Sequence, residues 1–334
     1  MRRKDRTVFP VMADLAAATF LEGATRLIRS LPKSTATALV TRLVRTFAPM
    51  LPRNRVGQEN LRLAFPDMEQ EQRDAILARM WENFARAFVE FIHVDEVFDY
   101  DPANPEAGSI AVSGAEHFER LRDAGKPAII FTAHLANWEL LGVCAARFGL
   151  DVASLFRPPT NRFVAKRLLQ ARSSVMGPLV ASRPGASLEL AAALEAGKIV
   201  GLLVDQRFHG GVTVPFFGRP ADTNPLLAKL ARRYECPVHG ARVVRLACGR
   251  LRLEISDAIC LPRDAEGHID IEQATAVVQR IVEGWVREYP DQWMWIHRRW
   301  RIGRKTRLPA APAGAAQSIG AREGDLTRDA SRPS

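Results

Sequence analysis

The sequence predicts an α/β protein with a largely parallel central sheet flanked by helices, preceded by further helices at the N-terminus. Beyond residue 109, short apolar strands alternate regularly with segments of helical periodicity. Repeated strand–helix–strand units favour parallel pairing, because each connection crosses a face of the sheet. The 334 residues are 47% hydrophobic and 25% charged, which suits a large folded domain and argues against a polytopic membrane protein.

The predicted strands and helices of this region follow one another along the chain. The strands are Pro127–Thr132, Val152–Phe156, Leu179–Ala181 and Ile199–Val204. The helices are Asn137–Phe148, Thr160–Val175, Ser187–Ala196 and a closing helix, Ile271–Tyr289. Between the last two helices, Val238–Leu246 and Leu251–Ile259 resemble a hairpin that turns at Cys248-Gly249.

Three helices are predicted before this region, over residues 10–31, 34–51 and 70–94. We divide the chain into a basic, membrane-associating helical segment (1–52), a main domain (53–307) and a tail rich in Pro, Ala, Gly and Ser (308–334) that we expect to be disordered. Apolar residues recur at helical spacing over 40–51, with arginines between them. This pattern fits a segment lying in a membrane interface, and it equally fits a packed helical hairpin.

Basic charge is concentrated at the two ends of the chain. Two blocks, Met1–Arg6 and Ile296–Arg307, account for nearly all of the net charge of +10. Such blocks suit anionic lipid head groups or nucleic acid, and they also fit solvated charge beside a tail. Charges interrupt every long apolar stretch, so neither a standard spanning helix nor a cleaved signal peptide is evident. Four widely spaced cysteines predict reduced thiols rather than disulfides or a zinc site.

Polar side chains follow three of the predicted strands. His134, Arg157 and Asp205 come directly after or at the end of their strands. Ligands of open α/β sheets bind at the carboxyl ends of the strands, so these residues predict a site at that edge.

His134 and Glu139 are the candidate catalytic pair. On one continuous helix, five residues turn about 500°, so the two side chains would point about 140° apart. If His134 lies in the turn and Glu139 in the first helical turn, the chain can fold the carboxylate back toward the imidazole. Such a carboxylate fixes the tautomer of the histidine and stabilises its charged form. A capping histidine and a glutamate that complements the helix dipole are the structural alternative.

Other catalytic classes lack their sequence signatures. There is no G-x-S-x-G elbow, no P-loop, and no G-x-G-x-x-G after a strand. Cys144 lies in an apolar stretch, which predicts that it is a core residue. A histidine base acting on a hydroxyl of the substrate remains, which implies direct transfer without a covalent enzyme intermediate.

The stretch His134–Glu139 resembles the H-x4-D/E motif of the lysophospholipid acyltransferase superfamily. It is most similar to the late acyltransferases of lipid A biosynthesis, the lauroyl/myristoyl transferase group. Further stretches resemble that group in order: Asn60–Pro66, Arg157–Asn161, Asp205–Arg207 continuing to Phe216–Thr223, and Tyr289–Trp300. The similarity covers about residues 10–303. The chain departs from the family at Ala136, where glycine is frequent, and at its charge-interrupted N-terminus.

The resemblance implies a glycerol-3-phosphate acyltransferase-like fold, an acyl-acyl carrier protein donor and a Kdo-bearing lipid A precursor as acceptor. It implies His134 as base and Glu139 as the group that orients it. The implied substrate-binding residues are Arg157, Asn161, Asp205, Gln206 and Arg207, with no metal and no cofactor. The expected place is the cytoplasmic face of the inner membrane, among its lipids, with no nucleic acid partner.

Two other functions stay open at this point. One is acyl transfer to another acceptor, such as lysophosphatidate or a glycolipid mannoside. The other is a non-catalytic protein that binds anionic lipid or nucleic acid. The second predicts a basic, aromatic surface without an assembled site at the strand edge, and RNA recognition favours aromatic side chains on a sheet face.

Overall fold

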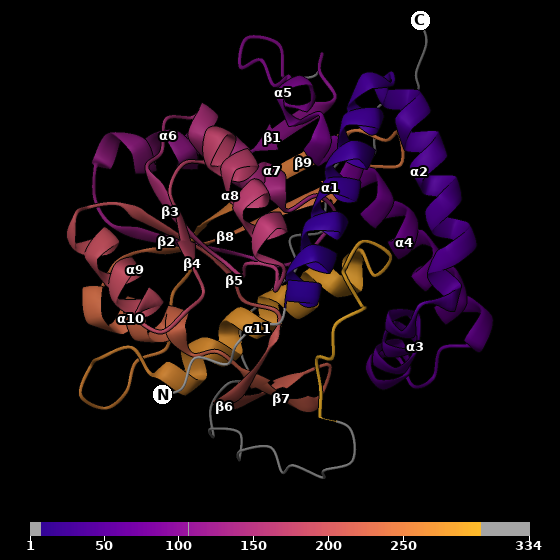
Figure 1. Ribbon diagram of the computed structural model, residues 1–334. Coiled ribbons are helices and arrows are strands. Elements are labelled where there is room, and N and C mark those ends of the chain that lie inside the picture. Colours follow the sequence, from indigo (N-terminus) through magenta and orange to yellow (C-terminus); the bar gives the residue numbers. More distant parts are fainter. Residues whose placement is uncertain (1–7, 106, 302–334) are drawn as a thin grey trace, which may run out of the picture.

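The central element is a seven-stranded sheet of order β1-β9-β8-β2-β5-β3-β4 (Figure 1). The computed structural model describes residues 8–105 and 107–301. The strands are β1 (Ile110–Ser113), β2 (Ala128–Thr132), β3 (Val152–Phe156), β4 (Leu179–Ala181), β5 (Ile199–Leu203), β8 (Val238–Arg245) and β9 (Leu251–Ala258). Strands β8, β2, β5, β3 and β4 are parallel, whereas β9 is antiparallel to β8 and parallel to β1. The predicted, largely parallel sheet and its β8–β9 hairpin are confirmed.

Helices cover both faces of the sheet because its central strands bury side chains on both sides. In β2, Ile129 and Phe131 belong to one hydrophobic core, and Ala128 and Ile130 belong to the other. The first core includes residues of α9 (Ala186–Glu195), α10 (Leu226–Tyr234) and α11 (Ile271–Glu288). The second includes residues of α5 (Val94–Val97), α6 (Ala115–Ala124), α7 (Glu139–Arg147) and α8 (Arg162–Met176).

The predicted helices are present, with ends that differ by a few residues. Two of them begin at side chains that accept backbone N–H groups, Asn161 before α8 and Asp270 before α11. Several elements were not predicted from the sequence, namely β1, α3 (Pro52–Ala64), α5, α6 and α10. A separate hairpin of β6 (Arg207–Phe216) and β7 (Arg219–Thr223), which lies below α11 in Figure 1, was not predicted either.

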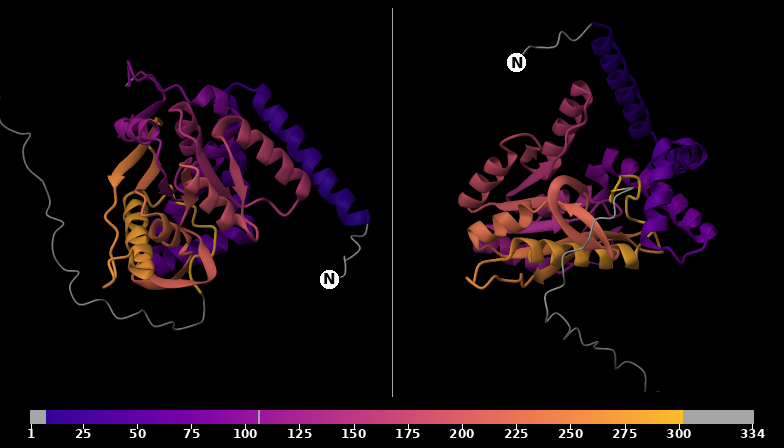
Figure 2. Two further views of the ribbon diagram at one scale, coloured as in Figure 1. Left: turned by 90° about the vertical axis from the view of Figure 1, so that its left-hand side faces the viewer. Right: turned by 90° about the horizontal axis from the view of Figure 1, so that it is seen from below.

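The N-terminal helices form a hairpin packed against the main domain. They are α1 (Val8–Ser30) and α2 (Lys33–Phe47), followed by η1 (Ala48–Met50), α3 (Pro52–Ala64) and α4 (Gln70–Ile92). Helix α2 packs along α4, and α1 reaches α8, where Arg167 donates to the Ala18 carbonyl at 2.7 Å. Figure 2 shows α1 extending beyond the rest of the molecule.

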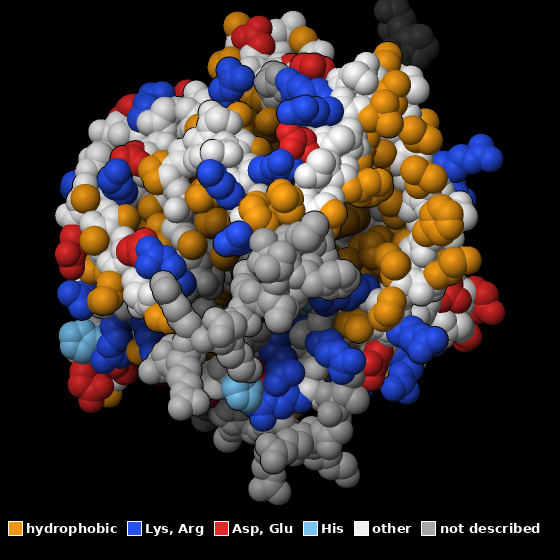
Figure 3. Space-filling view, in the orientation of Figure 1, with side chains coloured by type: hydrophobic (Ala, Val, Ile, Leu, Met, Phe, Trp, Pro, Cys, Tyr) orange, Lys and Arg blue, Asp and Glu red, His pale blue; other side chains and the backbone are white. Residues whose placement is uncertain are grey.

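The same helices expose an unusual amount of apolar surface. Figure 3 shows a band of hydrophobic side chains over α1 and α2. Its most exposed members are Phe20 (79%), Leu27 (61%), Phe47 (56%) and Met50 (78%). The α1–α2 hairpin therefore packs against α4 and α8 on one side and exposes apolar side chains on another. Across residues 8–105 and 107–301, no helix combines the length and hydropathy that a membrane crossing needs. The predicted disordered tail, 308–334, lies outside the described residues.

Candidate active site

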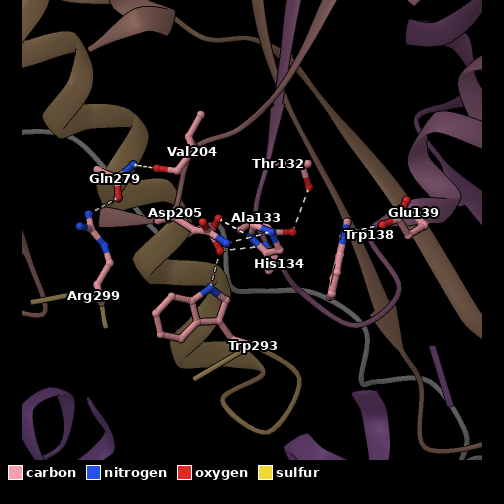
Figure 4. Close-up of polar contacts among 11 residues, drawn as sticks. Thr132, Ala133, His134, Trp138, Glu139, Val204, Asp205, Gln279, Trp293 and Arg299 are labelled. Atoms are coloured by element: carbon pink, nitrogen blue, oxygen red, sulfur yellow. Dashed lines mark hydrogen bonds and ion pairs between the residues drawn. The ribbon is translucent and has the colours of Figure 1, made fainter. Parts of the chain in front are cut away.

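The site is built where β2 and β5 end side by side. Thr132 pairs with Leu203 in the sheet, so His134 and Asp205, each two residues further along, emerge opposite each other. His134 Nδ1 lies 2.8 Å from Asp205 Oδ1, and the His134 backbone N–H donates to Asp205 Oδ2, also at 2.8 Å (Figure 4). The carboxyl ends of adjacent parallel strands thus assemble a histidine–carboxylate pair.

Asp205 is fully buried, yet every contact stabilises its charged form. Its Oδ2 atom also accepts the Trp293 indole N–H at 2.8 Å. Burial alone would raise the pKa of the Asp205 carboxyl, but the facing His134 ring and its hydrogen bonds hold that pKa well below the ordinary value. Asp205 is therefore a carboxylate at neutral pH, rigidly held against the imidazole.

The contact expected between Glu139 and His134 is replaced by the one from Asp205. As predicted, His134 lies in the turn and Glu139 begins α7. However, the Glu139 carboxylate accepts from Trp138 Nε1 at 3.1 Å and forms an ion pair with Arg172 of α8. The Trp138 ring packs against His134 at 4.9 Å between centroids, and Glu139 lies on its far side in Figure 4. The expectation failed because the sheet brings a more distant carboxylate to the imidazole.

The second ring nitrogen of His134 is available for chemistry. Because Nδ1 faces a carboxylate, Nδ1 carries the proton and Nε2 presents a lone pair. The nearest polar neighbour of Nε2 is the Gln206 amide nitrogen at 3.3 Å, a long contact that a substrate hydroxyl can replace. This geometry suits a general base, and the adjacent carboxylate stabilises the imidazolium that forms.

A C-terminal segment, 289–300, closes the site and was not among the predicted site residues. Ala136 N donates to the Gln292 carbonyl at 2.9 Å and Met294 N to the His134 carbonyl at 3.0 Å, so this segment pairs with the histidine loop. Ala136 itself has φ 45°, a left-handed conformation. That conformation gives a physical reason for the frequent glycine at this position in the resembling group.

Buried polar side chains support the pair from this segment. Arg299 is completely buried and donates to Gln279 Oε1 at 2.9 Å, while Gln279 Nε2 donates to the Val204 carbonyl at 2.9 Å (Figure 4). Burial lowers the pKa of Arg299 to about 10, which leaves it charged at neutral pH. This chain of contacts holds the backbone that carries Asp205.

His297 is a second histidine beside the first. Its ring centroid lies 6.2 Å from that of His134, and both of its ring nitrogens are buried with no hydrogen-bond partner among residues 8–105 and 107–301. Burial lowers the pKa of His297 to about 4, so the ring is neutral at neutral pH. Asn60, from the first of the resembling stretches, donates to the His297 carbonyl at 2.6 Å and so holds the segment in place.

The other predicted site residues have different surroundings. Arg157 is exposed directly after β3 and has no hydrogen bond or ion pair within the described part of the chain. Both polar atoms of Asn161 are engaged in the fold, since its oxygen caps α8 and its Nδ2 donates to the Asp14 carbonyl at 2.8 Å. Arg207 pairs with Asp222 at 3.3 Å. Of these predicted substrate-binding residues, Asp205 and Gln206 contact the His134 ring.

The described residues do not form a metal site, and Cys144 is not placed as a reactive thiol. Within residues 8–105 and 107–301, no three His, Cys, Asp or Glu side chains are grouped so that they could hold a metal ion. All four cysteines are free, and burial raises the pKa of the Cys144 thiol, which keeps it protonated. Cys144 is a core residue, as its sequence surroundings predict.

Sequence comparisons show which family the chain belongs to. A model of the bacterial lipid A biosynthesis acyltransferases matches residues 13–302. The chain belongs to this family. Similar proteins include the lipid A biosynthesis palmitoleoyltransferase of Escherichia coli K12, 23% identical over 275 residues, covering 79% of this chain and 84% of that protein. A lipid A biosynthesis acyltransferase of Haemophilus influenzae is 24% identical over 248 residues, covering 72% and 73%.

The lipid A acyltransferase family makes this chain a transferase of acyl groups in lipid A biosynthesis. In this acyltransferase, the stretches Asp205–Arg207 and Tyr289–Trp300 contact the histidine loop, and Asn60 holds the second of them. The nucleic-acid alternative required accessible aromatic side chains, but Trp293, Trp295 and Trp300 are at most 4% exposed. They are buried in the core instead, where Trp293 donates to Asp205.

Proposed function

We propose that this acyltransferase moves a fatty acyl chain from acyl-acyl carrier protein to a hydroxyl of a Kdo-bearing lipid A precursor, with His134 as general base. The observation that carries the proposal is the His134–Asp205 pair at 2.8 Å, whose Nε2 faces away from the buried carboxylate. The absence of a nucleophile signature in the sequence supports direct transfer.

The proposed reaction has one base and two bond changes. His134 Nε2 takes the proton of the acceptor hydroxyl as its oxygen attacks the thioester carbonyl, and a tetrahedral intermediate forms. Its collapse breaks the C–S bond, and the imidazolium returns the proton to the leaving thiolate. The Asp205 carboxylate stabilises the imidazolium throughout, a role that its three accepted hydrogen bonds and full burial favour.

The remaining predicted residues are proposed to act around this pair. Glu139 positions the site indirectly, because it holds both Trp138, which packs on His134, and Arg172. Arg157 is exposed at the carboxyl end of β3, where its guanidinium can bind a phosphate or carboxylate of a substrate. Gln206 binds the acceptor hydroxyl, and Arg207 orders the hairpin that follows. Asn161 contributes by capping α8.

A reconstituted assay tests the proposal. Purified enzyme is incubated with acyl-acyl carrier protein and a Kdo-bearing lipid A precursor, and products are measured by mass spectrometry. We expect one ester-linked acyl chain to be added to the lipid A precursor, with none added to lysophosphatidate in a parallel reaction. Efficient acylation of lysophosphatidate with an unchanged lipid A precursor would assign the enzyme to another acceptor.

We also propose that the enzyme works on the cytoplasmic face of the inner membrane, with α1 and α2 seated in the lipid interface. The exposed apolar band over these helices supports this placement. Arg26 and Arg42 on the same helices are exposed and can meet anionic head groups.

Replacing apolar side chains in this band is expected to weaken membrane binding. Phe20→Ser combined with Phe47→Ser removes two rings that would enter the lipid. Each buried aromatic contributes roughly 1.5–3 kcal/mol, so removing both rings should lower partitioning into anionic vesicles by about a hundredfold or more. Leu188→Ser on α9, 73% exposed but outside the band, is the control and should bind normally. Equal binding by all three proteins in vesicle co-sedimentation would remove α1–α2 as the membrane contact.

A further inference from the structure

A cavity opens at the same edge of the sheet as His134. It has a volume of about 780 Å³ and lies between α2, α4 and the strands β8 and β9. Arg245, the last residue of β8, lines it. Strand β8 is the parallel neighbour of β2, which carries His134, so this cavity and the catalytic pair share the carboxyl edge of the sheet.

Hydrogen bonds connect the cavity to the catalytic loop. Glu90 of α4 lines the cavity and receives both Arg245 Nη1 at 2.7 Å and Arg245 Nη2 at 2.9 Å. The same carboxylate accepts Asn137 Nδ2 at 3.0 Å, and Asn137 is three residues after His134. An occupant of the cavity therefore contacts a wall that also holds the histidine loop.

The side chains that line the cavity include more cations than carboxylates. Arg245 is paired with Glu90, and Arg45 is paired with Glu82 at 3.2 Å. Three other lining cations, Lys33, Arg42 and Arg86, have no carboxylate partner within the described residues. The buried Thr41 hydroxyl in the same wall also lacks a hydrogen-bond partner in the described part of the chain. Unpaired guanidinium groups beside a free hydroxyl match the oxygen atoms of a phosphate.

Helix α2 indicates where that phosphate comes from. Thr41, Arg42 and Arg45 on one side line the cavity. On an adjacent side of the same helix, Leu39 and Leu43 are 44% and 48% exposed. A helix with cations beside an exposed apolar row is typical of a membrane interface, where lipid phosphates lie next to acyl chains.

We infer that this cavity binds the phosphate group of a membrane lipid, with Arg42 and Arg86 as its principal ligands. The assignment of that lipid as the acceptor rests on the proposed function, whereas phosphate binding itself does not. A phosphate held here lies beside the loop of the catalytic base, so it positions the lipid for reaction at His134. The site thus selects phosphorylated acceptors over uncharged ones.

Binding of inorganic phosphate tests the site without catalysis. Wild type is compared by calorimetric titration with Arg42→Gln/Arg86→Gln and with a matched control, Lys126→Gln/Arg280→Gln. Both control residues are exposed and lack an ion pair in the described chain, and the pair removes the same two charges. We expect the cavity variant to bind phosphate about tenfold or more weakly, and the control to bind as wild type. Equal binding by all three proteins would overturn the inference. Arg42→Gln alone, at an exposed position, repeats the test if the double variant folds poorly.

Two further arms identify the source of the phosphate. Vesicles of phosphatidylcholine with phosphatidate should bind the cavity variant more weakly than wild type and the control, because the phosphate of phosphatidate can enter the cavity. In the acyl-transfer assay, the cavity variant should show a KM for the phosphorylated acceptor raised about tenfold, with kcat nearly unchanged. Weaker phosphate binding without either effect would assign the site to free phosphate and refute its lipid role. A complete lack of acyl transfer in wild type would instead refute the proposed function and leave the phosphate measurement intact.

Discussion

His134→Ala is expected to lower kcat for acyl transfer by at least about 10²–10⁴-fold, the usual contribution of general-base assistance. The reason is that Nε2 is the ring nitrogen whose lone pair can accept the hydroxyl proton, since Nδ1 is hydrogen-bonded to Asp205 at 2.8 Å. The fold should survive, because His134 lies in a turn and its side chain is 12% exposed. Steady-state rates and thermal unfolding of the same preparation measure both quantities.

A covalent mechanism gives a different result with labelled donor. Wild-type enzyme incubated with radiolabelled acyl-acyl carrier protein, without acceptor, should carry no label after denaturation. Stoichiometric label on a serine or cysteine would contradict direct transfer. Normal specific activity of His134→Ala, with reduced thermal stability, would show that the histidine has a structural role alone.

Asp205→Asn is expected to be nearly as damaging, lowering kcat on the order of 10²–10⁴-fold. Asparagine keeps the shape but removes the charge that stabilises the imidazolium, and it permits the wrong tautomer at His134. The pKa of Asp205 is lowered in the folded protein, so its charge stabilises the fold above the ordinary carboxyl range, and this contribution is lost as the pH falls. Asp205→Asn should therefore also unfold at lower temperature at neutral pH.

Glu139→Gln provides the matched comparison, since it makes the same chemical change in the other carboxylate. It removes the ion pair with Arg172 but leaves the His134–Asp205 contact intact. We expect a smaller loss of kcat than in Asp205→Asn. A loss of kcat in Glu139→Gln that exceeds the loss in Asp205→Asn would restore Glu139 as the partner of the base.

The sequence by itself determined the elements that local patterns encode. Apolar period and turn residues predicted the alternation of strands and helices, the β8–β9 hairpin and the positions of His134 and Glu139 relative to α7. The general rule for parallel sheets predicted that His134 and Asp205 would share an edge. Short or weakly patterned elements, such as β1 and the β6–β7 hairpin, were not predicted because their stability depends on contacts with distant strands.

Only the tertiary structure decided which carboxylate meets the base. Glu139 is five residues from His134 and looked closer, but the pairing of Thr132 with Leu203 sets Asp205 directly opposite. The same pairing of strands, together with the return of residues 289–300, brought Trp293 and Arg299 behind the site. A sheet brings residues that are far apart in the sequence within hydrogen-bond distance of each other. The register between two strands cannot be predicted from the sequence of one strand. For this acyltransferase, sequence spacing made His134 the candidate base, and strand register placed Asp205 beside it.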